Sequence, residues 1–216
     1  MNHDLKMILP KDLVCLDDYV GESPLVIDLA YARDDNLLFG ERIYSKDAKL
    51  WLYKDLAAVV LEAAKHVFQA IEGTLIIYDG LRVTDAQNAM LKTQAVQENP
   101  HWLEEPRLLS PPGAGGHPRA MAVDVSILDA DGKLLDMGTD FDDLTQAAHR
   151  GYPHPQSVQD NRALLDDAMM DAAQDRGVDL VPLPQEWWDY RLPAEIYEQY
   201  APLSDADLPH TMQLMD

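Results

Sequence analysis

The segment GGHPRAMAVDVSI contains a histidine and an aspartate at a spacing that could serve a metal ion. His117 ends a glycine-rich turn, and Asp124 follows seven residues later on an expected strand. An imidazole nitrogen and a carboxylate oxygen are both good zinc ligands. A single histidine near a strand is more often a hydrogen-bonding surface residue, so this pair by itself leaves both interpretations open.

The segment QEWWDYR contains two carboxylates around two adjacent tryptophans. Hydrolysis at a metal needs a carboxylate that takes and delivers protons, so Glu186 is a candidate general base and Asp189 a candidate ligand. Residues three apart on a straight strand point to opposite faces. Both acids can therefore serve one site only if the chain bends between them. The alternative is a strand at the edge of the core with solvated acids.

An arginine closes the segment YDGLR, directly after the apolar run TLIIY. Near a metal, Arg82 could polarise a carbonyl or stabilise an oxyanion. The alternative for Arg82 is an ordinary surface salt bridge, which contributes little to stability.

Three helices are expected to support these segments. Apolar residues at steps of three and four predict a helix over 47–71 that ends near Gly73. Thr84 and Gln87 form a capping-box pattern for a helix that runs to about Asn99. A third helix is expected over 157–176, with Gly177 as its stop.

Short apolar runs predict the strands. These are 22–31, 74–78, a hairpin of 121–128 with 133–137, and a last strand after residue 178. Residues 106–118 are rich in proline and glycine and predict a loop. Helices and hairpins mix without regular βαβ alternation, which favours an α+β fold. We expect one domain over 1–201 and a loose polar tail over 202–216.

Composition narrows the class of protein. Acidic residues number 38 and basic residues 17, for a formal charge of −21, which argues against nucleic-acid or anionic-membrane partners. The single Cys15 excludes a disulfide framework and a cysteine metal cluster. No apolar run approaches the ~18–20 residues of a membrane span, and no signal peptide is recognised, so a cytoplasmic protein is expected. The sequence does not indicate an oligomeric state.

Taken together, these segments resemble the VanX-type D-alanyl-D-alanine dipeptidases of the M15 zinc metallopeptidases. The resemblance covers about residues 11–200. The matching stretches are DLAYA (28–32), YDGLR (78–82), HPRAMAVD (117–124), DMGTDFD (136–142), His149, the NR pair (161–162) and EWW (186–188).

The resemblance implies a fold, a reaction and a metal set. The fold would be a single α+β domain with a central, mostly antiparallel sheet flanked by helices, as in the M15 and hedgehog-like peptidases. The substrate would be free D-Ala-D-Ala, hydrolysed to two D-Ala. One Zn²⁺ per chain would be held by His117, Asp124 and Asp189. Glu186 would be the general base, and Arg82 would stabilise the oxyanion.

The resemblance also places three aromatic side chains beside the substrate. These substrate-binding candidates are Tyr31, Trp187 and Trp188.

Three residues depart from the family pattern. Asp189 stands where the family has a histidine as its third zinc ligand. Ala120 stands in place of a glycine, and Gly115 in place of a serine. A ligand set of two carboxylates and one imidazole carries one more negative charge than a set of one carboxylate and two imidazoles. Its oxygen ligands make Mn²⁺ or Fe²⁺ more competitive with zinc. Restoring the histidine, Asp189→His, is therefore expected to raise zinc affinity. The methyl group of Ala120 is expected to disfavour a positive φ.

Two other functions remain open at this stage. The change at Asp189 is compatible with a non-catalytic protein that binds a D-amino-acid peptide or a partner. A third reading is an M15 carboxypeptidase that cuts longer D,D- or L,D-peptides.

Overall fold

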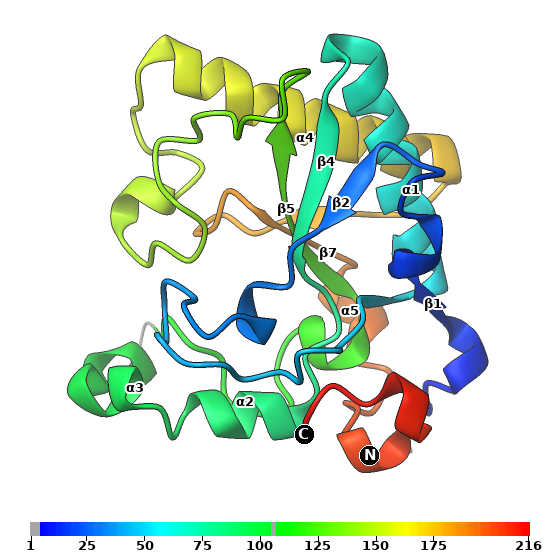
Figure 1. Cartoon of the computed structure of the whole chain (residues 1–216), viewed down its shortest axis with the longest axis vertical. Helices are drawn as coiled ribbons and strands as arrows, with labels where there is room; N and C mark the ends of the chain where they lie inside the picture. Colours follow the sequence, from blue (N-terminus) through cyan, green and yellow to red (C-terminus); the bar gives the residue numbers. More distant parts are fainter. Residues whose placement is uncertain (1–4, 105–106) are drawn as a thin grey trace.

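The computed structural model describes residues 5–104 and 107–216. Pro106, at the start of the expected loop, and the first four residues lie outside this range. A five-stranded sheet runs through the centre in the order β2-β4-β5-β7-β6 (Figure 1). Only β2 and β4 are parallel, so the expected mostly antiparallel α+β fold is confirmed. The strands are β1 (Leu13–Cys15), β2 (Leu25–Ile27), β3 (Trp51–Tyr53), β4 (Thr74–Asp79), β5 (Ala122–Leu128), β6 (Val181–Pro182) and β7 (Asp189–Arg191).

The helices flank this sheet. They are α1 (Lys54–Ile71), α2 (Thr84–Met90), α3 (Gln94–Glu98), α4 (Gln156–Arg176) and α5 (Ala194–Tyr197). Helices α1 and α4 pack against each other, and α1 also packs against β4. Residues alternate along β4: Leu75 and Ile77 enter the main core with α1, whereas Ile76 and Tyr78 join a smaller apolar cluster.

Helix α1 is shorter than its predicted range of 47–71. Residues Trp51–Tyr53 pair with β1 as a small antiparallel sheet, so the helix begins at Lys54. Its C-cap residue is Glu72, which has a left-handed φ of 53° and lies one residue before the predicted glycine stop. Helix α4 matches its prediction within one residue, and Gly177 closes it at φ 63°.

The predicted helix over 84–99 is interrupted after Met90 and continues as α3. The expected capping box is not formed, since Val83 is the N-cap residue. Gln87 instead accepts from the Gly113 amide at 2.8 Å and donates to the Ala114 carbonyl at 3.4 Å. This side chain therefore anchors the glycine-rich loop that leads to His117.

Two strand predictions were too long. The hairpin over 121–137 keeps β5, but its return segment makes only one bridge, from Leu128 to Leu134. The strand expected over 22–31 is limited to β2, because Ala30–Ala32 form a 3-10 turn.

The segment 202–216 is not a loose tail. It contains two short 3-10 turns and places four apolar side chains in the core: Leu203, Leu208, Met212 and Leu214. The Ser45 amide donates to the Leu214 carbonyl at 2.7 Å. The predominantly polar composition concealed these widely spaced anchors.

No helix in the described part of the chain is long and apolar enough to cross a membrane.

Candidate active site

Three aspartates lie in one row across the centre of the sheet. Asp124 on β5 pairs in register with Asp79 at the end of β4 and with Asp189 at the start of β7. All three are buried. Strand pairing thus brings together carboxylates that are far apart in the sequence.

His117 faces two of these aspartates from a short 3-10 turn. Its Nδ1 donates to the Gly80 carbonyl over 2.8 Å, which fixes the ring and turns Nε2 toward the sheet. Nε2 lies 3.3 Å from Asp189 Oδ2 and 3.5 Å from Asp124 Oδ1. The turn closes at Ala120, which adopts φ 55° despite its methyl group. The methyl group disfavours this conformation, but the chain adopts it at Ala120.

The three residues fit a divalent metal. Asp124 Oδ1 is buried without a hydrogen-bond partner. Such an orphaned acceptor is costly unless a cation satisfies it. Ligand atoms at 2.0–2.1 Å from a tetrahedral zinc lie about 3.3–3.4 Å apart. The distances from His117 Nε2 to the two carboxylates match this spacing.

The electrostatics of the cluster favour a cation at Nε2. Burial lowers the pKa of His117, but Asp124 and Asp189 together outweigh burial and raise the pKa to about 10. The imidazole therefore carries a second proton when no metal is present. A metal bound at this nitrogen would have to replace the proton.

Asp189 has a strong partner that the sequence analysis missed. Burial raises the pKa of Asp189, but Arg191 and His117 together outweigh burial and hold the pKa of this carboxyl well below its usual range. The guanidinium donates from Nε to Asp189 Oδ1 over 2.7 Å and from Nη2 to Oδ2. Residues two apart on a strand share a face, so the spacing of Asp189 and Arg191 could have indicated this pair.

Glu186 joins the cluster because the chain turns just before β7. Its carboxylate, with those of Asp124 and Asp189, forms a group whose oxygens lie within 4.8 Å of one another. Burial, followed by the charges of Asp189 and Asp124, raises the pKa of Glu186 to about 8. The bend that both acids require is therefore present.

Arg82 enters the site from the end of β4. Its Nε donates to Asp79 Oδ2 over 2.7 Å, and Tyr44 donates to the other oxygen of Asp79 over 2.8 Å. Nη2 lies 3.4 Å from Asp124 Oδ2 and from the hydroxyl of Tyr31. Arg82 is thus part of a buried network rather than a surface salt bridge.

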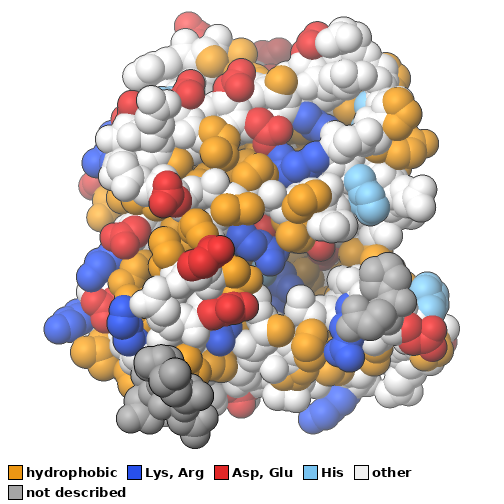
Figure 2. Space-filling model, turned by 180° about the vertical axis from the view of Figure 1, so that it is seen from behind, with side chains coloured by type: hydrophobic (Ala, Val, Ile, Leu, Met, Phe, Trp, Pro, Cys, Tyr) orange, Lys and Arg blue, Asp and Glu red, His pale blue; other side chains and the backbone are white. Residues whose placement is uncertain are grey.

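A cavity of about 540 Å³ opens over these groups. Figure 2 shows the molecule hollowed on the side away from the viewer of Figure 1, with basic side chains visible inside the hollow. Tyr31 and Trp188 line the cavity, whereas Trp187 lies outside its lining and donates to Thr139 over 2.8 Å. The other lining residues used below are Arg82, His117, Asp124, Asp142, Glu186, Asp189 and Arg191.

Comparison with known proteins assigns the chain to a family. The family model of the M15 peptidases, described as D-Ala-D-Ala dipeptidase, matches residues 12–205. The chain belongs to this family. The D-alanyl-D-alanine dipeptidase of Escherichia coli (strain K12) is 35% identical over 170 residues, which cover 78% of this chain and 79% of that protein. The solved L-Ala D-Glu endopeptidase ChiX of Serratia marcescens matches with a TM-score of 0.40 and 16% identity, over 80% of this chain and 93% of that one.

In this M15 chain, two further residues of the site were missed by sequence reasoning. Asp142 lines the cavity at a left-handed φ of 63° and accepts from the Tyr31 hydroxyl over 3.1 Å. Removal from water raises the pKa of Asp142 to about 7, against the opposing effect of Arg82. Arg150 lies behind β7 and donates to the carbonyls of Trp187 and Asp189. Their sequence positions contain no periodic signal for either role.

Two other histidines of this M15 chain, His149 and His154, do not join His117 in a group able to hold a metal among the described residues. His149 lines the cavity, but none of the groups able to hold a metal among the described residues contains it. His154 Nε2 is engaged with the Ala147 carbonyl over 2.7 Å.

Proposed function

We propose that the chain is a metal-dependent dipeptidase that hydrolyses free D-Ala-D-Ala to two D-Ala. The observation that supports this most directly is the convergence of His117 Nε2, Asp124 Oδ1 and Asp189 Oδ2 beside Glu186. Membership in the M15 family supports the same reaction class. The cavity of about 540 Å³ lies in the ~300–1,000 Å³ range of small-molecule sites, so a dipeptide fits.

One divalent ion, zinc by preference, would be held by His117, Asp124 and Asp189 and would supply Lewis-acid catalysis. Glu186 takes a proton from the attacking water and delivers it to the leaving amine. Its raised pKa suits both steps, because the protonated and ionised forms are both accessible near neutral pH. Arg82 provides positive charge where the carbonyl oxygen becomes negative.

Two lining groups would position the dipeptide. Asp142 presents a carboxylate to the cavity and matches the ammonium end of the substrate. Tyr31 holds that carboxylate through its hydroxyl, and its ring lies 4.9 Å from the Arg82 guanidinium carbon. Tyr31 would thereby contact both Asp142, which faces the substrate ammonium, and Arg82, which faces the reacting carbonyl.

The test is a combined metal and activity measurement. Protein purified without chelator is analysed for bound metal, and D-Ala release from D-Ala-D-Ala is followed with added Zn²⁺, Mn²⁺ or Fe²⁺. We expect about one metal per chain and turnover. A protein that contains no bound metal and shows no turnover with any added metal would contradict the proposal.

That negative result would favour a second function, a protein that binds a D-amino-acid peptide without cleaving it. The engagement of both Asp189 oxygens by Arg191 is the observation that favours this alternative. Calorimetry with D-Ala-D-Ala and added Zn²⁺, together with an assay for D-Ala, separates the two, since the non-catalytic protein would bind the peptide and leave it intact.

A further inference from the structure

Asp189 and Arg191 form a forked ion pair at the edge of the metal cluster. Each carboxylate oxygen accepts from a different guanidinium nitrogen. The side chain of Asp189 is 1% exposed and that of Arg191 is 18% exposed. Bidentate, largely desolvated pairs of this kind are the strong ones, and their geometry is specific to arginine.

The charges around the cluster explain why such a pair matters. The Arg191 guanidinium interacts electrostatically with the carboxylates of Asp189, Glu186 and Asp124. Two carboxylate ligands and a neutral imidazole carry −2, and Arg191 brings this sum to −1. A ligand set of one carboxylate and two neutral imidazoles also carries −1.

We infer that Asp189 and Arg191 act together as one neutral ligand unit, in which Arg191 is a positioning residue that orients the Asp189 carboxylate and offsets its charge toward a divalent ion. This inference depends on the metal site of the proposed function. It adds that the ligand at position 189 is the pair rather than the aspartate alone.

The stereochemistry allows both contacts at once. A carboxylate oxygen has two lone pairs, so Asp189 Oδ2 can accept from Arg191 and still face the position beside His117 Nε2. Gly115 lies next to the guanidinium: a Cβ added there would be 4.0 Å from Arg191 Nη1. The left-handed φ of 84° at Gly115 favours glycine at this place.

The inference reverses the simple expectation for Asp189→His. A histidine there removes the carboxylate that hydrogen-bonds to Arg191 and leaves this largely buried cation close to a divalent ion. We therefore expect Asp189→His to bind zinc at least tenfold more weakly than the unmodified protein. The double variant D189H/R191M also removes the positive charge of Arg191. Its zinc affinity should return to within a few-fold of that of the unmodified protein.

Zinc dissociation constants from chelator competition at one fixed pH test this cycle. D189H/R191K keeps the positive charge and should remain as weak as D189H, which separates charge from side-chain size. R176M removes an exposed arginine paired with Glu62 and serves as the matched control, with no change expected. If D189H binds zinc as tightly as the unmodified protein, the inference is wrong. If the unmodified protein binds no zinc, the proposed function fails as well.

The metal-free protein gives a second, independent measurement. R191M removes the guanidinium that engages both Asp189 oxygens and leaves only His117 Nε2 beside Oδ2, so the Tm in chelator should fall. D189N/R191M removes the buried carboxylate charge that has lost its guanidinium and should recover part of this loss. An unchanged Tm in R191M would show that Arg191 does not hold Asp189 and would overturn the inference without reference to activity.

Discussion

Arg150 and Asp189 are joined through the backbone: Arg150 Nη2 donates to the Asp189 carbonyl over 3.1 Å and to the Trp187 carbonyl over 2.9 Å. Nε of the same side chain donates to the Leu183 carbonyl over 2.9 Å. One guanidinium thus fixes the start, the middle and the end of the turn that carries Glu186. The shape that brings both acids into one site depends on this residue.

Replacement of Arg150 should therefore lower metal affinity and activity, although we do not expect its side chain to touch the substrate. We expect R150M to lower zinc affinity and kcat by about 10–100-fold each, the usual effect of losing a group that orients metal ligands. Chelator competition and D-Ala release measure the two effects. R176M is again the control, and equal values in R150M and R176M would contradict this role.

Glu186 is expected to act on the proton rather than on the metal. E186Q should reduce kcat by about 10²–10⁴-fold, because the amide cannot accept the proton of the attacking water. Elemental analysis should still find metal, since His117, Asp124 and Asp189 are unchanged. The exposed Glu195 offers the control variant E195Q. Turnover that survives in E186Q would indicate another base.

Asp142 should make the stability of the metal-free protein depend on pH. Burial raises its pKa to about 7, so the folded chain keeps a proton that the unfolded chain has already released above about pH 4. The stabilisation is complete below about pH 4 and is lost as the pH rises through about 7. The amide in D142N has no such proton.

Urea unfolding from about pH 5 to about pH 7 in chelator tests this sign. The free energy of unfolding should fall more with rising pH in the unmodified protein than in D142N. The exposed Asp140 provides the control D140N, which should follow the unmodified protein. Parallel curves for D142N and the unmodified protein would rule out the predicted contribution.

Local patterns predicted the elements whose stability is local. Helix α4 ends at a glycine, and its predicted range differed by one residue. The candidate ligands His117 and Asp124 come from one segment, and the family resemblance added Asp189. What the sequence does not contain is the register that sets Asp79, Asp124 and Asp189 in one row, because pairing between distant strands determines it.

The contacts of side chains with distant backbone were also out of reach. Arg150 lies 39 residues before the Asp189 carbonyl that it binds, and no spacing rule links the two. The sequence assigned Gln87 to a helix cap, but its side chain instead accepts a hydrogen bond from the Gly113 amide in the loop. Tertiary partners override local propensity at such positions.

Ala120 allows a test of backbone strain beside His117. A left-handed alanine costs roughly 1–2 kcal/mol, which glycine avoids, while glycine loses a buried methyl group and more chain entropy. We expect A120G to change the free energy of unfolding by less than about 1 kcal/mol, because these effects oppose each other.

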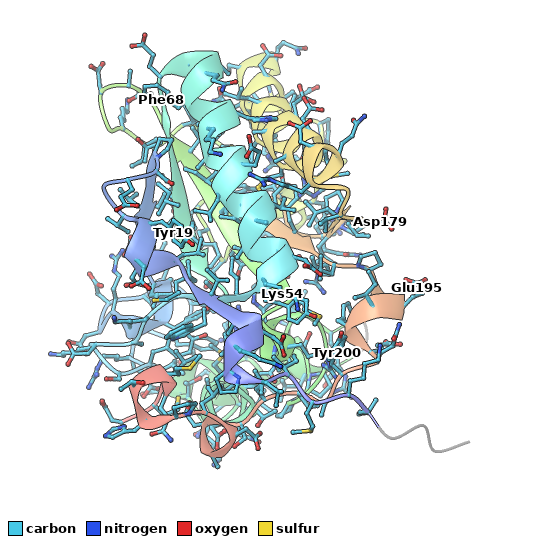
Figure 3. All side chains as sticks on the ribbon, turned by 90° about the vertical axis from the view of Figure 1, so that its right-hand side faces the viewer. Tyr19, Lys54, Phe68, Asp179, Glu195 and Tyr200 are labelled. Carbon is cyan, nitrogen blue, oxygen red and sulfur yellow. The ribbon has the colours of Figure 1, made fainter. Side chains whose placement is uncertain are left out.

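Ala63 is the matched control for this substitution. It is fully buried in α1, which Figure 3 shows running from Lys54 past Phe68 beside α4. A63G loses the methyl group and helix propensity without any relief of strain, so it should cost about 1 kcal/mol or more. Denaturant unfolding compares the two. An equal loss in A120G and A63G would mean that the left-handed turn stores no strain.

The C-terminal segment should contribute to global stability. Leu214 is 1% exposed, its carbonyl accepts from Ser45, and its amide donates to Asp205 Oδ1 over 2.9 Å. L214A should lower the free energy of unfolding by about 2–5 kcal/mol, the usual cost of truncating a buried leucine. The exposed Thr211 gives the control T211A, which should stay within about 0.5 kcal/mol of the unmodified protein. If urea unfolding finds L214A and T211A equally stable, the segment behaves as the loose tail that its composition predicted.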